Sequence, residues 1–81
     1  VMNMIIKNSE IKKYKSNLKR IRVMKGFTQQ DIAALSGINI KSIASYEQDP
    51  EKINKASVET IYQLADSLGC DISDIIERKY L

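Results

Sequence analysis

The apolar positions of this chain recur mostly at spacings of three and four residues, which is the period of one helix face. In the segment SEIKKYKSNLKRIRVMKGF, this spacing joins Ile11, Tyr14, Leu18 and Ile21. The pattern predicts a first helix that begins near Tyr14, with Ser9 or Ser16 as the candidate caps. Gly26 is predicted to end this helix, because glycine readily adopts the left-handed backbone of a helix end.

The next two predicted helices are short and are joined by a single glycine. Thr28 suits the start of the first, because its hydroxyl can accept the N–H of Asp31 while the Asp31 carboxylate bonds back. Its inner face is predicted to be Ile32, Ala33 and Leu35. Gly37 makes the turn, Asn39 caps the second helix, and Pro50 closes it. Helices this short are marginal alone, so tertiary packing must hold them.

The remaining chain predicts a polar loop and two further helices. The loop is EKINKA, residues 51–56. Ser57 caps the next helix and Gly69 ends it, while Asp71 or Ser73 begins the last helix. The buried stripe of the longer helix is predicted to be Val58, Ile61, Leu64, Ala65 and Leu68. The predicted fold class is therefore all-α, with five helices in one compact domain.

The composition gives no support for catalysis or metal binding. Among 81 residues there is no histidine, a single cysteine and three separated glycines, whereas a zinc site needs several Cys or His ligands. Cys70 is expected to be a small buried hydrophobe, since no histidine is present to activate its thiol. We therefore expect a protein that is not an enzyme and that has no cofactor, metal or small-molecule ligand.

The sequence also gives an expected location in the cell. No apolar run approaches the roughly 18 residues of a membrane span. The first ten residues, VMNMIIKNSE, lack the small-residue cleavage pattern of a signal peptide. A cytoplasmic protein without a membrane partner is the expectation.

Charge is distributed unevenly along the chain. Residues 1–25 carry a net charge of +7, residues 26–56 carry −1 and residues 57–81 carry −3. A basic end suits a polyanion such as nucleic acid or an anionic membrane, and it equally suits a solvated helix face. Charge alone leaves these interpretations open.

Residues 28–47 have the spacing of a helix-turn-helix, in which a second helix is held outward for a DNA major groove. Ala33 is small where the two helices would cross, and Gly37 makes the turn. The residues predicted to anchor the second helix are Ile38, Ile43 and Tyr46. Any helical hairpin can show this spacing by chance, so it is weak evidence by itself.

Longer motifs extend this evidence. The segments LKRIRVMKGFTQQDIAALSGI, SIASYE and SVETIYQLADSLGCDISDII occur in that order. Over residues 14–77 the chain resembles the lambdoid repressor and Cro type of helix-turn-helix domain, called the XRE family in bacteria. The resemblance implies a lambda-repressor-like fold, with residues 1–13 as a basic extension and 78–81 as a tail. It also implies a sequence-specific regulator of transcription that binds double-stranded DNA, with repression as the expected mode.

The resemblance also implies a role for individual residues. Base readout is assigned to Ile40, Lys41, Ala44 and Ser45. Phosphate contacts are assigned to Thr28, Gln29, Asn39, Gln48, Lys52, Asn54 and Lys55. Lys41 suits a guanine edge, while Ile40 suits either a thymine methyl or a neighbouring helix. Arg22 and Glu47 match a structural ion pair of the family.

Two features depart from the family pattern. The loop QDPEKINKA is longer than the corresponding loop of relatives, which makes its phosphate contacts the least secure of those assigned. A basic stretch, comprising Lys7, Lys12, Lys13 and Lys15, precedes the family domain. This stretch is either an arm that follows the DNA backbone or simply solvated charge.

The expected partners are a second copy of the chain, DNA and, in the alternative interpretation, a basic protein. A near-palindromic operator implies a homodimer, with a predicted contact through Ile72, Ile75, Ile76, Tyr80 and Leu81. The alternative for these residues is that they only close the core of one copy. The alternative function is a protein-interaction module, such as an antitoxin or adaptor, that docks a basic partner through the acidic half.

Overall fold

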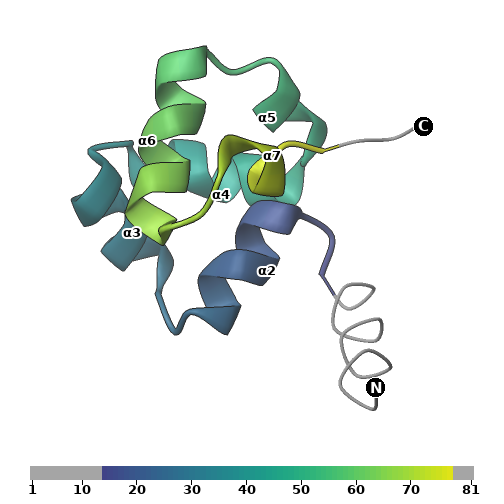
Figure 1. The fold of residues 1–81 in the computed structure, drawn as a ribbon. Coiled ribbons are helices and arrows are strands. Elements are labelled where there is room, and N and C mark those ends of the chain that lie inside the picture. The colour runs from purple at the N-terminus through teal and green to yellow at the C-terminus, as the bar shows by residue number, and fades with distance from the viewer. Residues whose placement is uncertain (1–13, 78–81) are drawn as a thin grey trace.

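The computed structural model describes residues 14–77, and all regular structure within that range is helical. The helices are α2 (Asn17–Met24), α3 (Gln29–Ser36), α4 (Ile40–Gln48), α5 (Glu51–Asn54), α6 (Val58–Leu68) and α7 (Ile72–Ile75). The longest of them, α6, packs against α3 and α7, while α2 packs against α4 and α7 (Figure 1). The all-α fold class is confirmed.

Four of the six described helices, α2, α3, α4 and α6, begin after a residue whose side chain accepts a backbone N–H of the first turn. These caps are Ser16, Thr28, Asn39 and Ser57. Thr28 and Asp31 form both bonds of a capping box, at 3.0 and 2.8 Å. Ser16 accepts the N–H of Lys19 at 2.9 Å, so α2 begins at Asn17. The predicted start near Tyr14 is therefore wrong, because the cap lies two residues further along the chain.

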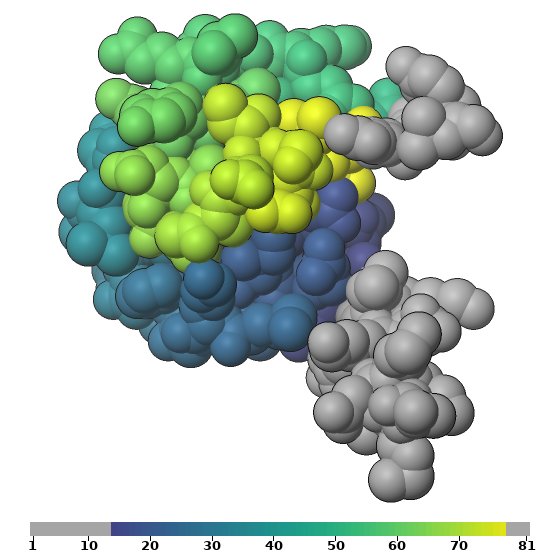
Figure 2. Space-filling view, in the orientation of Figure 1, coloured from purple at the N-terminus to yellow at the C-terminus, as the bar shows by residue number. Residues whose placement is uncertain are grey.

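A single core unites all the described helices. Its fully or nearly fully buried apolar residues are Leu18, Ile21, Ile32, Ile43, Ile53, Ile61, Leu64, Ala65, Leu68 and Ile75. Every helix from α2 to α7 contributes at least one of them. The short α7 lies between α6 and α2 and covers the core on one face of the molecule (Figure 2). Each described helix therefore buries its apolar residues against the other helices of the same core.

The expected number of helices is corrected from five to the six that residues 14–77 contain. The additional helix, α5, lies within the segment predicted to be a polar loop. Pro50 precedes it with φ −60°, an angle that suits the start of a helix. Ile53 is 1% exposed and anchors this turn in the core. An isolated isoleucine in a polar stretch is the sequence signal for this helix.

Two residues predicted to lie on inner helix faces are exposed instead. Leu35 is 60% exposed and Val58 is 76% exposed. In α3 the buried position next to Leu35 is taken by Ser36, whose hydroxyl accepts the N–H of Ile38 at 3.0 Å. This hydrogen bond satisfies the buried hydroxyl, so a polar residue can occupy the inner face. Val58 lies at the first position of α6, beyond the edge of the core.

Cys70 follows α6 and is half-buried against the core, rather than fully buried as expected. Burial raises the pKa of its thiol above the usual value, and the carboxylate of Asp74 adds to this shift. The thiol therefore stays protonated near neutral pH.

A network of hydrogen bonds joins the two ends of the described chain. The carboxylate of Glu77 accepts the N–H of Asn17 at 2.6 Å, and the Asn17 amide donates to the carbonyl of Ile76 at 2.9 Å. The Asn54 side chain bonds the Glu77 backbone in both directions, at 2.6 and 2.9 Å. These bonds fix the chain after α7 to the start of α2 and to α5.

No helix in residues 14–77 is long and apolar enough to cross a membrane.

A matched pair of substitutions on α3 tests the observed burial. Ile32→Ala removes a side chain that is 0% exposed, and we expect the free energy of unfolding to fall by about 2–5 kcal/mol. Leu35→Ala removes the same number of carbons from the exposed face, and we expect a change within about 0.5 kcal/mol. Urea denaturation of both variants measures the difference. Equal losses would contradict the assignment of the two faces.

Candidate nucleic-acid interface

Helices α3 and α4 are joined by a tight turn that holds them as one unit. Gly37 has φ +78°, and its N–H donates to the carbonyl of Ala33 at 3.0 Å. A Cβ on Gly37 would meet nothing within 4 Å, so the left-handed backbone, not lack of space, favours glycine here. Ile43 is fully buried, while Ala33, Ile38 and Tyr46 are half-buried and pack against the core.

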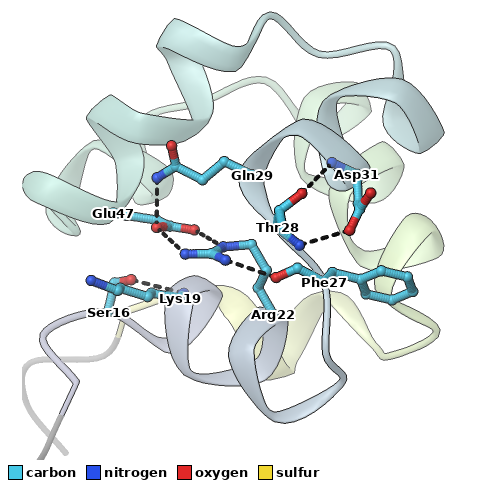
Figure 3. A network of polar contacts seen from close by, with 8 residues as sticks. All are labelled: Ser16, Lys19, Arg22, Phe27, Thr28, Gln29, Asp31 and Glu47. Carbon is cyan, nitrogen blue, oxygen red and sulfur yellow. Dashed lines mark hydrogen bonds and ion pairs between the residues drawn. The ribbon is translucent and has the colours of Figure 1, made fainter.

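A buried ion pair fixes α4 to α2 (Figure 3). Arg22 Nε donates to Glu47 Oε2 at 2.7 Å, and Arg22 Nη2 donates to Glu47 Oε1 at 3.0 Å. The third donor, Nη1, bonds the carbonyl of Phe27 in the α2–α3 turn at 2.8 Å. The two side chains are 10% and 4% exposed. The bidentate geometry sets the orientation of α4 as well as its distance from α2.

Gln29 adds the start of α3 to this network. Its Nε2 donates to Glu47 Oε1 at 2.9 Å. An amide nitrogen carries two hydrogens, so one remains for a further acceptor. Gln29 lies in the first turn of α3, where backbone N–H groups and the helix dipole favour an anion. The free protein therefore presents a Gln29 side chain that is already held in place.

The outer face of α4 carries the residues assigned to base readout. Ile40 is 37% exposed and Lys41 is exposed, while Ala44 and Ser45 are half-buried. Lys52 reaches back from α5, and its Nζ donates to Ser45 Oγ at 3.0 Å. A second cation thus joins Lys41 on this face.

The residues assigned to phosphate contacts lie at the surface. Gln29 is half-buried, and the exposed ones are Thr28, Asn39, Gln48, Lys52, Asn54 and Lys55. Thr28 and Asn39 also cap α3 and α4, so their oxygens accept backbone N–H groups. The amide of Asn54 bonds the Glu77 backbone through both its nitrogen and its oxygen. Asn54 therefore also holds the C-terminal segment, and its phosphate contact stays a prediction.

Only some of the residues assigned to the dimer contact have side-chain surface that a second copy could reach. Ile75 is 0% exposed and belongs to the core of one copy, so the structure corrects its assignment. Ile72 and Ile76 are half-buried and pack against that core. Tyr80 and Leu81 lie outside the described residues, as do the basic residues Lys7, Lys12 and Lys13.

The structure also brings together residues that sequence reasoning did not connect. A surface hollow of about 400 Å³ lies where α2, α3 and α4 meet. Its lining consists of Tyr14, Lys15, Lys19, Gln29, Ala44, Glu47 and Gln48. The sequence places Lys15 only within a possible basic arm and indicates no role for Lys19. The only sequence signal for Lys19 is its position one turn before Arg22 on a basic helix.

Comparison with models of protein families identifies the domain that contains α3 and α4. The model of a family described as Helix-turn-helix matches residues 18–75, which is most of the chain. The chain belongs to the XRE family of helix-turn-helix proteins. It is accordingly a DNA-binding regulator of transcription of the Cro/C1 type. Searches of curated proteins and of solved structures gave no match.

The surface formed by α3 and α4 carries polar and cationic side chains. Within residues 14–77, no three Cys, His, Asp or Glu side chains come close enough to hold a metal ion. The groups available at this surface are amides, hydroxyls and lysine ammonium ions. Such groups bind phosphates and base edges by hydrogen bonds and charge.

The Arg22–Glu47 pair makes a prediction about stability. Arg22→Met or Glu47→Met leaves one buried charge without its partner, and we expect each to lower the free energy of unfolding by about 3–5 kcal/mol. The double variant removes both charges, and we expect it to lose less than either single variant. Urea denaturation of all three provides the test.

Arg20→Met is the matched control for this series. Arg20 lies on the same helix but is less buried, and among residues 14–77 its guanidinium bonds only the Asn17 side chain, at 3.3 Å. We expect a change within about 0.5 kcal/mol. A double variant that loses the sum of the two single losses would contradict the proposed coupling.

Proposed function

We propose that this XRE-family protein represses transcription by binding a near-palindromic operator as a homodimer, with α4 of each copy in a major groove. One observation carries the proposal. The exposed face of α4 and the first turn of α3 are held by the same ion-pair network, through Arg22, Glu47 and Gln29. A surface that is fixed before binding loses little conformational entropy when it meets a rigid duplex.

Within this proposal, the polar groups divide into readers and anchors. Lys41 donates to the O6 and N7 acceptors of guanine, and Ile40 packs against a thymine methyl. Ser45 and Ala44 complete the base-facing surface. The anchors on the DNA backbone are Thr28, Gln29, Asn39, Gln48, Lys52, Asn54 and Lys55. Phosphate contacts of this kind fix register, while the base contacts supply sequence preference.

Selection from a random duplex pool at about physiological salt tests the proposal directly. We expect enrichment of a two-fold symmetric sequence whose half-sites are about 34 Å apart, one turn of the duplex. Enrichment of a single half-site would mean that one copy reads DNA alone. No enrichment would contradict sequence-specific binding.

Lys41 separates DNA reading from the alternative of a protein-docking module. That alternative is favoured by α6, where Val58 and Tyr62 are 76% and 58% exposed beside the acidic Asp66. We expect Lys41→Ala to weaken binding to the selected site by about 5- to 150-fold and to relax preference at one position. Lys41→Glu should abolish binding, whereas Lys25→Ala should leave it nearly unchanged. A protein whose cellular activity survives Lys41→Glu acts through docking instead.

The proposed dimer contact combines Ile72 and Ile76 with the tail residues Tyr80 and Leu81. Sedimentation equilibrium at tens of micromolar protein tests it, and we expect a dimer. Tyr80→Ala/Leu81→Ala should weaken dimerisation at least tenfold, whereas Tyr62→Ala on α6 should not. A monomer at these concentrations contradicts the dimer, and dissociation by Tyr62→Ala instead would place the contact on α6.

A further inference from the structure

We infer that the hollow between α2, α3 and α4 is a binding site for a backbone phosphate of duplex DNA, with Lys19 and Lys15 as its cationic ligands. The inference rests on the proposed function, because it extends the same DNA-facing surface beyond the residues assigned so far. It gives a role to Lys19, which neither the motifs nor the base-reading face includes.

The hollow has room for a phosphate group. Its volume is about 400 Å³, and its lining comes from α2, α3, α4 and the residues just before α2. Ala44, from α4, forms part of the wall, and its short side chain keeps the space open. The hollow opens to solvent rather than enclosing a cavity, so a polymer that passes over the surface can place one group in it.

The charge of the hollow is positive once its existing pair is accounted for. Glu47 contributes the single carboxylate of the lining. Both of its oxygens already accept hydrogen bonds from Arg22, and one also accepts from Gln29. The Arg22 guanidinium compensates this charge, which leaves the ammonium groups of Lys15 and Lys19 as an excess of positive charge.

These two lysines are available to a ligand. Both are exposed, and within residues 14–77 neither ammonium group donates a hydrogen bond or forms an ion pair. The backbone of Lys19 is fixed, since its N–H donates to Ser16 Oγ at the start of α2. The side chain is therefore anchored at its base and free at its charged end.

The position of the hollow favours duplex DNA over a free anion. Gln29 and Gln48 line it, and both also belong to the surface proposed to contact the DNA backbone. Ala44 belongs at once to the hollow and to the base-facing side of α4. A strand whose bases meet α4 and whose phosphate meets Gln29 would carry another phosphate past Lys19.

The salt dependence of binding to a random-sequence duplex tests this site without requiring a known operator. We expect Lys19→Gln to lower the slope of log K against log salt by about 1, since one phosphate is no longer neutralised. Lys19→Arg should restore it. The matched control is Lys25→Gln, which removes the same charge from the other end of α2, outside the hollow. We expect its slope to stay near that of the unsubstituted protein.

Replacing single DNA phosphates with uncharged methylphosphonates identifies the phosphate that Lys19 contacts. In the selected operator, single methylphosphonate replacements should weaken binding of the unsubstituted protein at several positions, and one position beside each half-site should be the phosphate that Lys19 contacts. Lys19→Gln should be insensitive at that position and remain sensitive at the others. Thermal unfolding of each variant should match the unsubstituted protein, since Lys19 is exposed.

The outcomes separate the inference from the proposed function. Equal slope changes for Lys19→Gln and Lys25→Gln would overturn the site while leaving DNA binding intact. A second result would assign the hollow to a free anion instead. In that case Lys19→Gln binds DNA as the unsubstituted protein does, and titration of the unsubstituted protein with inorganic phosphate shifts the NMR signals of the Lys19 and Gln29 amides until they saturate. Failure of the unsubstituted protein to bind any duplex would overturn both.

Discussion

The buried pair of Arg22 and Glu47 is the interaction on which the surface proposed to face DNA depends. Its hydrogen bonds reach α2, the α2–α3 turn, the start of α3 and α4. Removing two charges from water is costly, so such a pair adds little net stability over a well-packed apolar pair. Its fixed geometry is the greater contribution, because a guanidinium fork and a carboxylate meet in few orientations. The orientation of α4 follows from that constraint.

The shortness of the helices makes this constraint necessary. Apart from α6, which has 11 residues, the described helices have between four and nine. Helices of this length are marginal in isolation and hold their shape through a common core. Apolar packing fixes which faces turn inward but permits small rotations about the helix axis. The polar network removes that freedom where α3 meets α4.

Local chemistry was the part of the structure that the sequence predicted well. Caps such as Thr28 and turns such as Gly37 act through neighbouring residues, so their outcome can be inferred from a short segment. The inner face of α3 was less predictable, because Ile32, Ala33 and Leu35 are all apolar and eight residues define no clear stripe. The bonds of Asn54 and the hollow around Lys19 join segments distant in sequence, and no local pattern encodes them. Long-range polar contacts were therefore the main omission.

The attachment of Glu77 to Asn17 has a consequence for how the protein is made. These residues are 60 positions apart, so the ribosome completes α2 long before the carboxylate that caps its first N–H exists. Contacts between such distant residues form late, because closing a long loop costs entropy before any bond compensates. A nascent chain thus carries α3 and α4 well before the start of α2 is secured. The hydrogen bond that caps the first N–H of α2 therefore forms only after α7 has been synthesised.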